Sequence, residues 1–351
     1  MNTAEETSQA LDRIPGIEVS RCEPLARHTR FGIGGPAEVF AEADRAAALI
    51  GALELARSSG WQYVVIGGGT NLIVSDGGFP GLVLRFTGKR MEADGATVTA
   101  QAGATLQDLV DFSIGRGLKG IETLAGIPGW VGGAVYGNAG AYGHSISERV
   151  SRARIHDGAA VRDIDNAACD FRYRESVFKR DKAWIVLEVE LDLTPGSREE
   201  LRETAGRIVT ARNEKFPPEM KCAGSIFKNL LLADLPGVVA TQVPQEVVRE
   251  GKIPAAWFLE QSGAKGQARG GIHVASYHAN LIYNDGSGTV RELRELIGDL
   301  KAGVRARFGL ELEEEVQYVG FDSPEENHPM NFGAILLVAL AAPTSDLRAG
   351  A

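Results

Sequence analysis

The sequence predicts a protein of mixed helices and strands with two or three domains. The chain has 351 residues, which exceeds the usual size of one hydrophobic core, and 44% of them are apolar. Its 43 glycines are many for a helical protein and indicate tight turns, or loops that press against a ligand. These observations favour a glycine-rich enzyme.

Short apolar strands and amphipathic helices alternate along the first half of the chain. The longest strand candidate alternates apolar and polar residues, which predicts one buried face. Of the two helix candidates, Gly60 ends the first and Thr105 begins the second. The expected strands are residues 63–66, 82–86, 96–103 and 184–193, and the expected helices are residues 44–59 and 105–114.

The second half contains two longer helix candidates. Residues 199–215 carry apolar positions at helical spacing. This helix must end before Pro217 and Pro218, since proline cannot continue a helix, and the break marks a domain boundary. Thr289 and Glu292 form a capping box ahead of a second amphipathic helix.

Residues 311–319 are expected to form a strand beyond the second helix. Alternate side chains of a strand share a face. An acidic run of this kind is also typical of a solvent-exposed strand edge. The two faces would hold Glu313, Glu315 and Gln317 on one side and Leu312, Glu314 and Val316 on the other.

Composition argues against several classes of function. A net charge of -9 and a pI near 5.3 disfavour a nucleic-acid partner, which needs a basic face. Cys22, Cys169 and Cys222 are too far apart for a zinc site and do not suggest a disulfide framework. The chain start lacks a signal-peptide pattern, and the apolar run 332–342 is shorter than the ~20 residues of a membrane span. We expect a cytoplasmic protein with no metal and no membrane partner.

Three glycine clusters occupy residues 32–40, 66–81 and 126–143. The first has the spacing of a dinucleotide-binding turn, but Pro36 interrupts it and a strand-like run follows, so we disfavour that interpretation. The second follows a strand, and its three consecutive glycines expose backbone N–H groups that suit a phosphate. The third is longer than a turn requires and suits an extended ligand.

Together, 66-IGGGTNLIVSDGGFPG-81 and 124-LAGIPGWVGGAVYGNAGAYG-143 strongly resemble the FAD-binding segments of the UDP-N-acetylenolpyruvoylglucosamine reductase family. One further similar segment precedes these two and others follow, all in family order, so the resemblance covers about residues 24 to 320. The short spacing between Arg174 and Ser225 resembles the subgroup that lacks an inserted fold and its substrate-closing tyrosine loop. The further segments are 28-HTRFGIGGPAEV-39, 173-YRESVFK-179, 223-AGSIFKN-229, 255-AAWFLEQSGAKG-266, 270-GGIHVASYHANLIYN-284 and 308-FGLELEEEVQYVG-320.

The resemblance implies an α+β fold. A two-part FAD-binding module of the vanillyl-alcohol-oxidase (PCMH) type would precede a C-terminal α+β substrate-binding domain, and we expect the enzyme to be monomeric. The expected units are an N-terminal extension (1–22), FAD-binding subdomains 1 (23–87) and 2 (88–202), the substrate-binding domain (203–322) and a C-terminal tail (323–351).

The resemblance also implies a reaction, the NADPH-dependent reduction of UDP-N-acetylglucosamine enolpyruvate to UDP-N-acetylmuramate in peptidoglycan precursor synthesis. Non-covalently bound FAD would accept hydride from NADPH and pass it to C3 of the enolpyruvyl group, with a proton added at C2. The residues expected to bind FAD are Gly67, Gly68, Gly69, Thr70, Asn71, Gly126, Ile127, Pro128, Gly129, Gly132, Gly133, Asn138, Gly140, Ala141 and Tyr142.

Arg174, Ser225 and Glu315 match the family's catalytic positions. Hydride addition leaves negative charge at C2 and the carboxylate, which Arg174 is expected to stabilise while Ser225 donates the proton. Without the resemblance, Arg174 would be interpreted as an ordinary surface arginine and Ser225 as a turn residue. Arg172 is the other candidate for the role assigned to Arg174. The residues expected to contact the substrate are Tyr173, Lys228 and Asn229.

Cys222 is a second reactive candidate, because a thiol is a better nucleophile than the Ser225 hydroxyl. The implied reaction has no covalent step, so we expect Cys222 to pack and its replacement by Ser to be nearly silent. We also assign His278 to packing or support. Lys265 and Arg269 are expected either at the substrate's pyrophosphate or in a solvated loop.

Two other functions remain open. A flavin oxidase of the vanillyl-alcohol-oxidase type would use a similar FAD module, but would not explain residues 223–229 and 312–316. A non-catalytic protein that binds a flavin or a nucleotide sugar would be expected to lack Arg174, Ser225 or Glu315, and all three are present.

Overall fold

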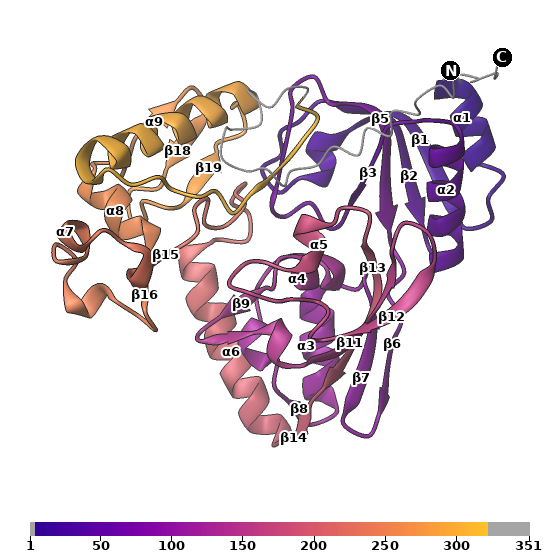
Figure 1. Cartoon of the computed structure of the whole chain (residues 1–351), viewed down its shortest axis with the longest axis horizontal. Coiled ribbons are helices and arrows are strands. Elements are labelled where there is room, and N and C mark those ends of the chain that lie inside the picture. The colour runs from indigo at the N-terminus through magenta and orange to yellow at the C-terminus, as the bar shows by residue number, and fades with distance from the viewer. Residues whose placement is uncertain (1–3, 322–351) are drawn as a thin grey trace, which may run out of the picture.

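The computed structural model describes residues 4–321 and shows a module of two sheets followed by a smaller C-terminal domain (Figure 1). We call residues 4–215 the N-terminal module and residues 216–321 the C-terminal domain. No helix in this described range is long and apolar enough to cross a membrane. The expected tail 323–351, with its apolar run 332–342, lies outside the described residues.

The first sheet of the N-terminal module has the strand order β1-β2-β5-β3. β1 pairs with β2 antiparallel, whereas β2 and β3 both run parallel to β5. Helix α2 packs on this sheet through a buried stripe that includes Leu49 and Leu53. The elements are α1 (Ala4–Leu11), β1 (Ile17–Pro24), β2 (Pro36–Ala43), α2 (Ala46–Ser58), β3 (Tyr63–Ile66) and β5 (Phe79–Phe86).

The second sheet is antiparallel throughout, in the order β12-β11-β13-β7-β6. Its buried residues join those of the first sheet in one hydrophobic core, which includes Leu84 of β5 and Val189 of β13. The two expected FAD-binding subdomains therefore share a core. The elements are β6 (Met91–Asp94), β7 (Thr97–Gln101), α3 (Leu106–Gly115), α4 (Val131–Tyr136), β11 (Val150–His156), β12 (Val161–Asp165), β13 (Ile185–Asp192) and α6 (Arg198–Lys215).

The C-terminal domain is built on a second core, in which helix α9 packs near the small sheet β17-β18-β19. Phe31, Ile33 and Ile73 of the N-terminal module also belong to this core. The predicted capping box of Thr289 and Glu292 begins α9, and Gly309 ends it at a φ of 68°. The elements are β15 (Leu230–Leu231), α7 (Gly237–Ala240), β16 (Lys252–Ile253), α8 (Ala255–Gln261), β17 (Ala268–Arg269), β18 (Ile272–Val274), β19 (Ile282–Asn284) and α9 (Val290–Phe308).

The chain finally returns to the N-terminal module, where β20 (Gln317–Val319) pairs in parallel with β4 (Leu72–Val74). This pairing places the end of the C-terminal domain beside the second glycine cluster. The remaining short elements are β8 (Leu118–Lys119), β9 (Gly140–Ala141), β10 (His144–Ser145), α5 (Val177–Arg180), β14 (Thr194–Pro195) and 3-10 turns at Leu25–His28, Glu122–Leu124, Ile146–Glu148, Leu232–Asp234 and Gln245–Val247.

The expected strand over 311–319 is wrong for most of its length. Only β20 belongs to a ladder, while Glu314 makes an isolated bridge with Phe227. The cause is that this segment passes between the 226–228 segment and Asn71, and makes only two hydrogen bonds with each. Burial nevertheless alternates as expected, since Leu312, Glu314 and Val316 are buried and their neighbours are more exposed.

The other helices and strands expected from the sequence occur within one to a few residues of their predicted limits. Thr105 caps α3 by accepting a hydrogen bond from the Asp108 N–H, and α6 ends at Lys215, before the two prolines. Residues 36–43 form β2, so no helix follows the first glycine cluster and the dinucleotide-turn interpretation is excluded.

Candidate functional site

A cavity of about 760 Å³ opens between the N-terminal module and the C-terminal domain. One side is formed by the second and third glycine clusters and by β3. The other side is formed by the end of α6 and by the C-terminal segments around Ser225, Asn280 and Glu315. A ligand in this cavity would therefore contact both parts of the chain, and we call it the interdomain pocket.

The second glycine cluster can take its course only without side chains at Gly68 and Gly69. A Cβ atom on Gly68 would lie 2.9 Å from the Trp130 ring, and one on Gly69 would lie 1.6 Å from the backbone oxygen of His28. Gly69 also has a φ of 67°, which glycine adopts without strain. The backbone of this loop is thereby available at the pocket wall, as an FAD diphosphate would require.

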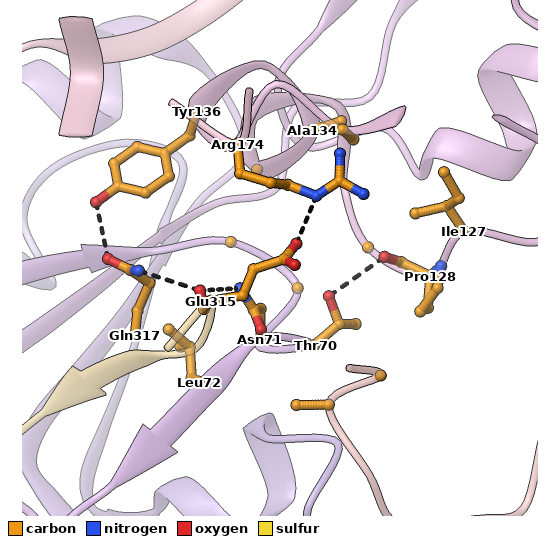
Figure 2. A pocket seen from close by; sticks show the side chains of 18 of the residues that line it. Thr70, Asn71, Leu72, Ile127, Pro128, Ala134, Tyr136, Arg174, Glu315 and Gln317 are labelled. Atoms are coloured by element: carbon orange, nitrogen blue, oxygen red, sulfur yellow. Dashed lines mark hydrogen bonds and ion pairs between the residues drawn. The ribbon is translucent and has the colours of Figure 1, made fainter. Parts of the chain in front are cut away.

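The third glycine cluster packs directly on the second. The Thr70 hydroxyl donates a hydrogen bond of 3.3 Å to the Pro128 carbonyl (Figure 2), and a Cβ atom on Gly129 would lie 2.9 Å from the Thr70 hydroxyl oxygen. Thirteen of the residues expected to bind FAD line the pocket. They are Gly67, Gly68, Gly69, Thr70, Asn71, Ile127, Pro128, Gly129, Gly132, Gly133, Gly140, Ala141 and Tyr142.

Gly126 and Asn138 were also expected to bind FAD, but they do not line the pocket. The Gly126 N–H donates a hydrogen bond to the Gln107 side chain. Asn138 is buried at a φ of 43°, and its side-chain amide donates to the carbonyl oxygen of Arg172 at 2.8 Å. In this structure Asn138 therefore supports the loop from behind.

Arg174 and Glu315 form an ion pair in the pocket, with 2.8 Å between Arg174 Nε and Glu315 Oε1 (Figure 2). A terminal nitrogen of the same guanidinium donates to the Gly140 carbonyl at 2.8 Å. Arg174 has a φ of 56°, a strained conformation for a residue with a side chain and one that recurs at functional sites. The charge of Arg174 is thus held between the third glycine cluster and the C-terminal domain.

The backbone around Glu315 connects three parts of the site. The Glu315 N–H donates to the Ile226 carbonyl at 2.7 Å, and the Asn71 side-chain amide donates to the Glu315 carbonyl at 2.9 Å. The Gln317 N–H then donates to the Asn71 carbonyl at 2.9 Å. Glu315 is therefore fixed both to the segment that carries Ser225 and to the second glycine cluster.

Ser225 follows Gly224, which turns the chain at a φ of 79°. Ser225 lines the pocket and is partly buried. Among residues 4–321, no side chain or backbone group forms a hydrogen bond with the Ser225 hydroxyl. The hydroxyl is therefore available to a ligand. The three residues proposed as catalytic, Arg174, Ser225 and Glu315, all line the same pocket.

The three expected substrate contacts are placed differently from one another. Tyr173 and Asn229 line the pocket, and the Asn229 N–H donates to the Tyr173 hydroxyl at 3.3 Å. Lys228 does not line it, because its ammonium donates to Glu175 at 2.6 Å and to Glu313. Burial works against the charge of Lys228, but the two hydrogen bonds and the negative charges of Glu175 and Glu313 together outweigh burial and raise the pKa of Lys228 above its ordinary value.

Comparisons with known proteins agree at both ends of the chain. Residues 37–159 match a family model described as an FAD binding domain, and residues 216–319 match the C-terminal domain of UDP-N-acetylenolpyruvoylglucosamine reductase. The chain is 63% identical to the UDP-N-acetylenolpyruvoylglucosamine reductase of Solibacter usitatus, over 88% of its own length and 98% of that protein. The chain belongs to this reductase family.

Other relatives agree. The reductase of Rubrobacter xylanophilus is 38% identical over 85% of this chain and 94% of its own length. The crystal structure of UDP-N-acetylenolpyruvylglucosamine reductase from Thermus caldophilus matches with a TM-score of 0.68 at 28% identity, over 86% of this chain and 98% of that one. The predicted α+β fold, FAD cofactor and oxidoreductase class are confirmed. The C-terminal match also decides against the flavin oxidase alternative.

Sequence reasoning missed a group of cations in the pocket of this reductase. Arg212 and Lys215 end α6, and Arg249 approaches from the C-terminal domain. Within the described range none of the three forms an ion pair with a carboxylate. Burial, and then the charges of Arg212 and Arg249, lower the pKa of Lys215. The basic last turn of α6 was the available signal, but it also suits an ordinary helix end.

Residues that compete with the proposed catalytic set are accounted for by packing or pairing. Cys222 is fully buried against Ala275 and Leu281, as expected of a packed thiol. His278 lines the pocket, but burial, followed by the charge of Lys215, lowers its pKa to about 4. His278 is therefore neutral near pH 7. Lys265 and Arg269 do not line the pocket and pair with Glu260 and Asp299 instead.

Lys182 is another unpredicted cation of the pocket wall. Its ammonium donates a hydrogen bond to the Tyr136 hydroxyl, which in turn donates to the Gln317 side chain at 3.3 Å. Burial, together with the nearby charge of Lys179, lowers the pKa of Lys182 to about 8. Burial also raises the pKa of Tyr136, so the tyrosine stays a neutral partner.

Replacing Lys182 by methionine is expected to raise the Tm of the FAD-free protein at pH 7. The folded-state pKa of about 8 lies below the ordinary value near ~10.4, so the unfolded chain holds this proton more tightly. The free energy of unfolding therefore rises with pH between these values, and below the lower one the buried charge costs the native state about 3 kcal/mol.

Thermal melts of wild type and Lys182→Met from pH 7 to pH 10 test this expectation. The gain in Tm should shrink as the pH rises, because the wild-type lysine then loses its charge. Exposed Lys89→Met is the matched control. A lower Tm of Lys182→Met at pH 7 would show that Lys182 stabilises the fold instead.

Proposed function

We propose that this enzyme reduces the enolpyruvyl group of UDP-N-acetylglucosamine enolpyruvate with NADPH, giving UDP-N-acetylmuramate. The observation that carries the proposal is the convergence of Arg174, Glu315 and the unpartnered Ser225 hydroxyl in a pocket walled by two glycine loops. Relatives over nearly the whole chain carry the name of this activity.

FAD, when bound, supplies the hydride carrier between NADPH and C3 of the enolpyruvyl group. Arg174 binds the substrate carboxylate, and its permanent charge stabilises the negative charge that develops there and at C2. Glu315 orients the Arg174 guanidinium through the 2.8 Å ion pair. Ser225 delivers a proton to C2. A hydroxyl can act as the acid in this step because the carbanion at C2 is a strong enough base to take its proton.

The nucleotide part of the substrate suits the charge of the pocket. Arg212, Lys215 and Arg249 are cations without carboxylate partners in the described range, and their mutual repulsion disfavours the empty pocket. A diphosphate would neutralise them with charge-assisted hydrogen bonds. These cations support a polyanionic substrate in a chain whose net charge is -9.

Product analysis tests the proposal. We expect FAD-loaded enzyme, incubated with NADPH and the enolpyruvyl substrate, to consume one NADPH for each substrate and to form a product heavier by two hydrogens. Mass spectrometry should identify the product as UDP-N-acetylmuramate. NADPH consumption that does not depend on the enolpyruvyl substrate would contradict the proposal.

A further inference from the structure

Two tight turns from different parts of the chain meet at the pocket. The first lies between β9 and β10, with Tyr142 at a φ of 53° and Gly143 at 81°. The second lies between Arg249 and Lys252, whose backbones exchange two hydrogen bonds of 2.9 Å. Its two central residues, Glu250 and Gly251, also have positive φ. Both are two-residue turns of the kind that hold their geometry rigidly.

The turns touch across the boundary between the N-terminal module and the C-terminal domain. A Cβ atom on Gly143 would lie 2.7 Å from the Glu250 carboxylate, so the Glu250 side chain rests against the backbone of the first turn. Lys252 strengthens the same contact, with its ammonium 4.9 Å from the centre of the Tyr173 ring. The turn at 249–252 thereby contacts the N-terminal module at two places, Gly143 and Tyr173.

Both turns also face the interdomain pocket. Tyr142 and Arg249 line it, and Tyr142 is 56% exposed, as expected of a residue at the pocket mouth. Within the described range the Arg249 guanidinium has neither an ion pair nor a hydrogen bond. Its carboxylate neighbour Glu250 pairs with Lys252 at 3.8 Å instead. Arg249 is therefore an exposed cation without a carboxylate partner in this range, and its charge acts on Lys215.

We propose that these two turns close the pocket mouth over the nucleotide sugar, and that Arg249 binds its diphosphate. This inference rests on the proposed function. A guanidinium can hold two phosphate oxygens at once through its planar fork, and the turn at 249–252 supplies it from the C-terminal domain. The contact would replace the closure expected from the tyrosine loop that the family subgroup lacks.

Arg249→Met tests the charge, because methionine keeps much of the apolar side-chain length. We expect the KM for the enolpyruvyl substrate to rise at least tenfold with kcat within about twofold, as the loss of a charged hydrogen bond implies. Calorimetry should show the same loss of affinity for UDP-N-acetylglucosamine, which carries the same diphosphate. Arg249→Lys should recover part of the affinity, and exposed Arg90→Met should match wild type.

NADPH also carries a diphosphate, so the rate of flavin reduction by NADPH is measured separately. An effect on the nucleotide sugar alone, or on both ligands, supports the proposal, whereas an effect on NADPH alone overturns it. Unchanged KM and unchanged UDP-N-acetylglucosamine affinity also overturn it. Calorimetry tests the binding role of Arg249 even if the wild-type enzyme does not reduce the enolpyruvyl substrate. A failure of that reduction would count against the proposed function only.

Gly143→Ala provides a second variant that leaves Arg249 in place. Alanine there is strained at a φ of 81° and meets the Glu250 carboxylate, so the contact between the Glu250 side chain and the first turn is lost. We expect a loss of nucleotide-sugar affinity, which calorimetry with UDP-N-acetylglucosamine measures on protein whose FAD content matches wild type. Wild-type affinity in this variant would show that the contact between the turns does not contribute to closure.

Discussion

Replacing Ser225 by alanine is expected to slow reduction of the enolpyruvyl substrate by about 10²–10⁴-fold, the usual contribution of a positioned proton donor. Reduction of the flavin by NADPH should proceed at nearly the wild-type rate, because that step needs no proton at C2. The Ser225 hydroxyl has no protein partner in the described range, so its removal breaks no internal hydrogen bond. Stopped-flow absorbance of the flavin measures the two steps separately.

Cys222→Ser is the matched control for Ser225→Ala. Cys222 lies three positions earlier but is fully buried away from the pocket, so its replacement should leave both rates nearly unchanged. Equal slowing of the two steps in Ser225→Ala would contradict a proton-donor role. Such a result would point to a general disturbance of the pocket.

Replacing Arg174 by methionine is expected to lower the rate of enolpyruvyl reduction by about 10²–10³-fold, the range observed when a group that stabilises developing charge is removed. The variant also leaves Glu315 without its cation, which adds a negative charge beside the substrate carboxylate. Arg174→Lys should recover little, because one guanidinium contacts both Glu315 and the Gly140 carbonyl. Single-turnover oxidation of the reduced enzyme measures the effect.

Arg172→Met is the control for Arg174→Met. Arg172 is the competitor two residues away, but its side chain is 68% exposed and pairs with Asp170. We expect its replacement to leave enolpyruvyl reduction within about twofold of wild type, as surface ion pairs contribute little. A larger effect for Arg172→Met than for Arg174→Met would show that Arg172, and not Arg174, binds the substrate carboxylate.

Much of the fold could be predicted from local patterns. The capping box at Thr289, the glycine that ends α9 and the prolines after α6 set helix limits because each acts on its neighbouring residues alone. The strand expected at 311–319 was wrong because alternating burial does not require a ladder. That alternation arises here from packing between two other segments, which no local pattern reveals.

The residues of the candidate site that lie within the ordered sequence motifs could be predicted. The glycine loops and Arg174, Ser225 and Glu315 belong to such motifs, and the structure brings most of them to one pocket. Arg212, Lys215, Arg249 and Lys182 were missed, because their importance depends on the absence of nearby carboxylates and on contacts between distant segments. Lys228 is the opposite case, a residue predicted to contact the substrate that does not line the pocket. Its ammonium forms ion pairs with Glu175 and Glu313 instead.

The most direct test of the account is an anaerobic experiment on the FAD-loaded wild-type enzyme. We expect one equivalent of NADPH to bleach the yellow flavin spectrum, and one equivalent of UDP-N-acetylglucosamine enolpyruvate then to restore it fully. A flavin that NADPH reduces but that the enolpyruvyl substrate leaves reduced would contradict the proposed function.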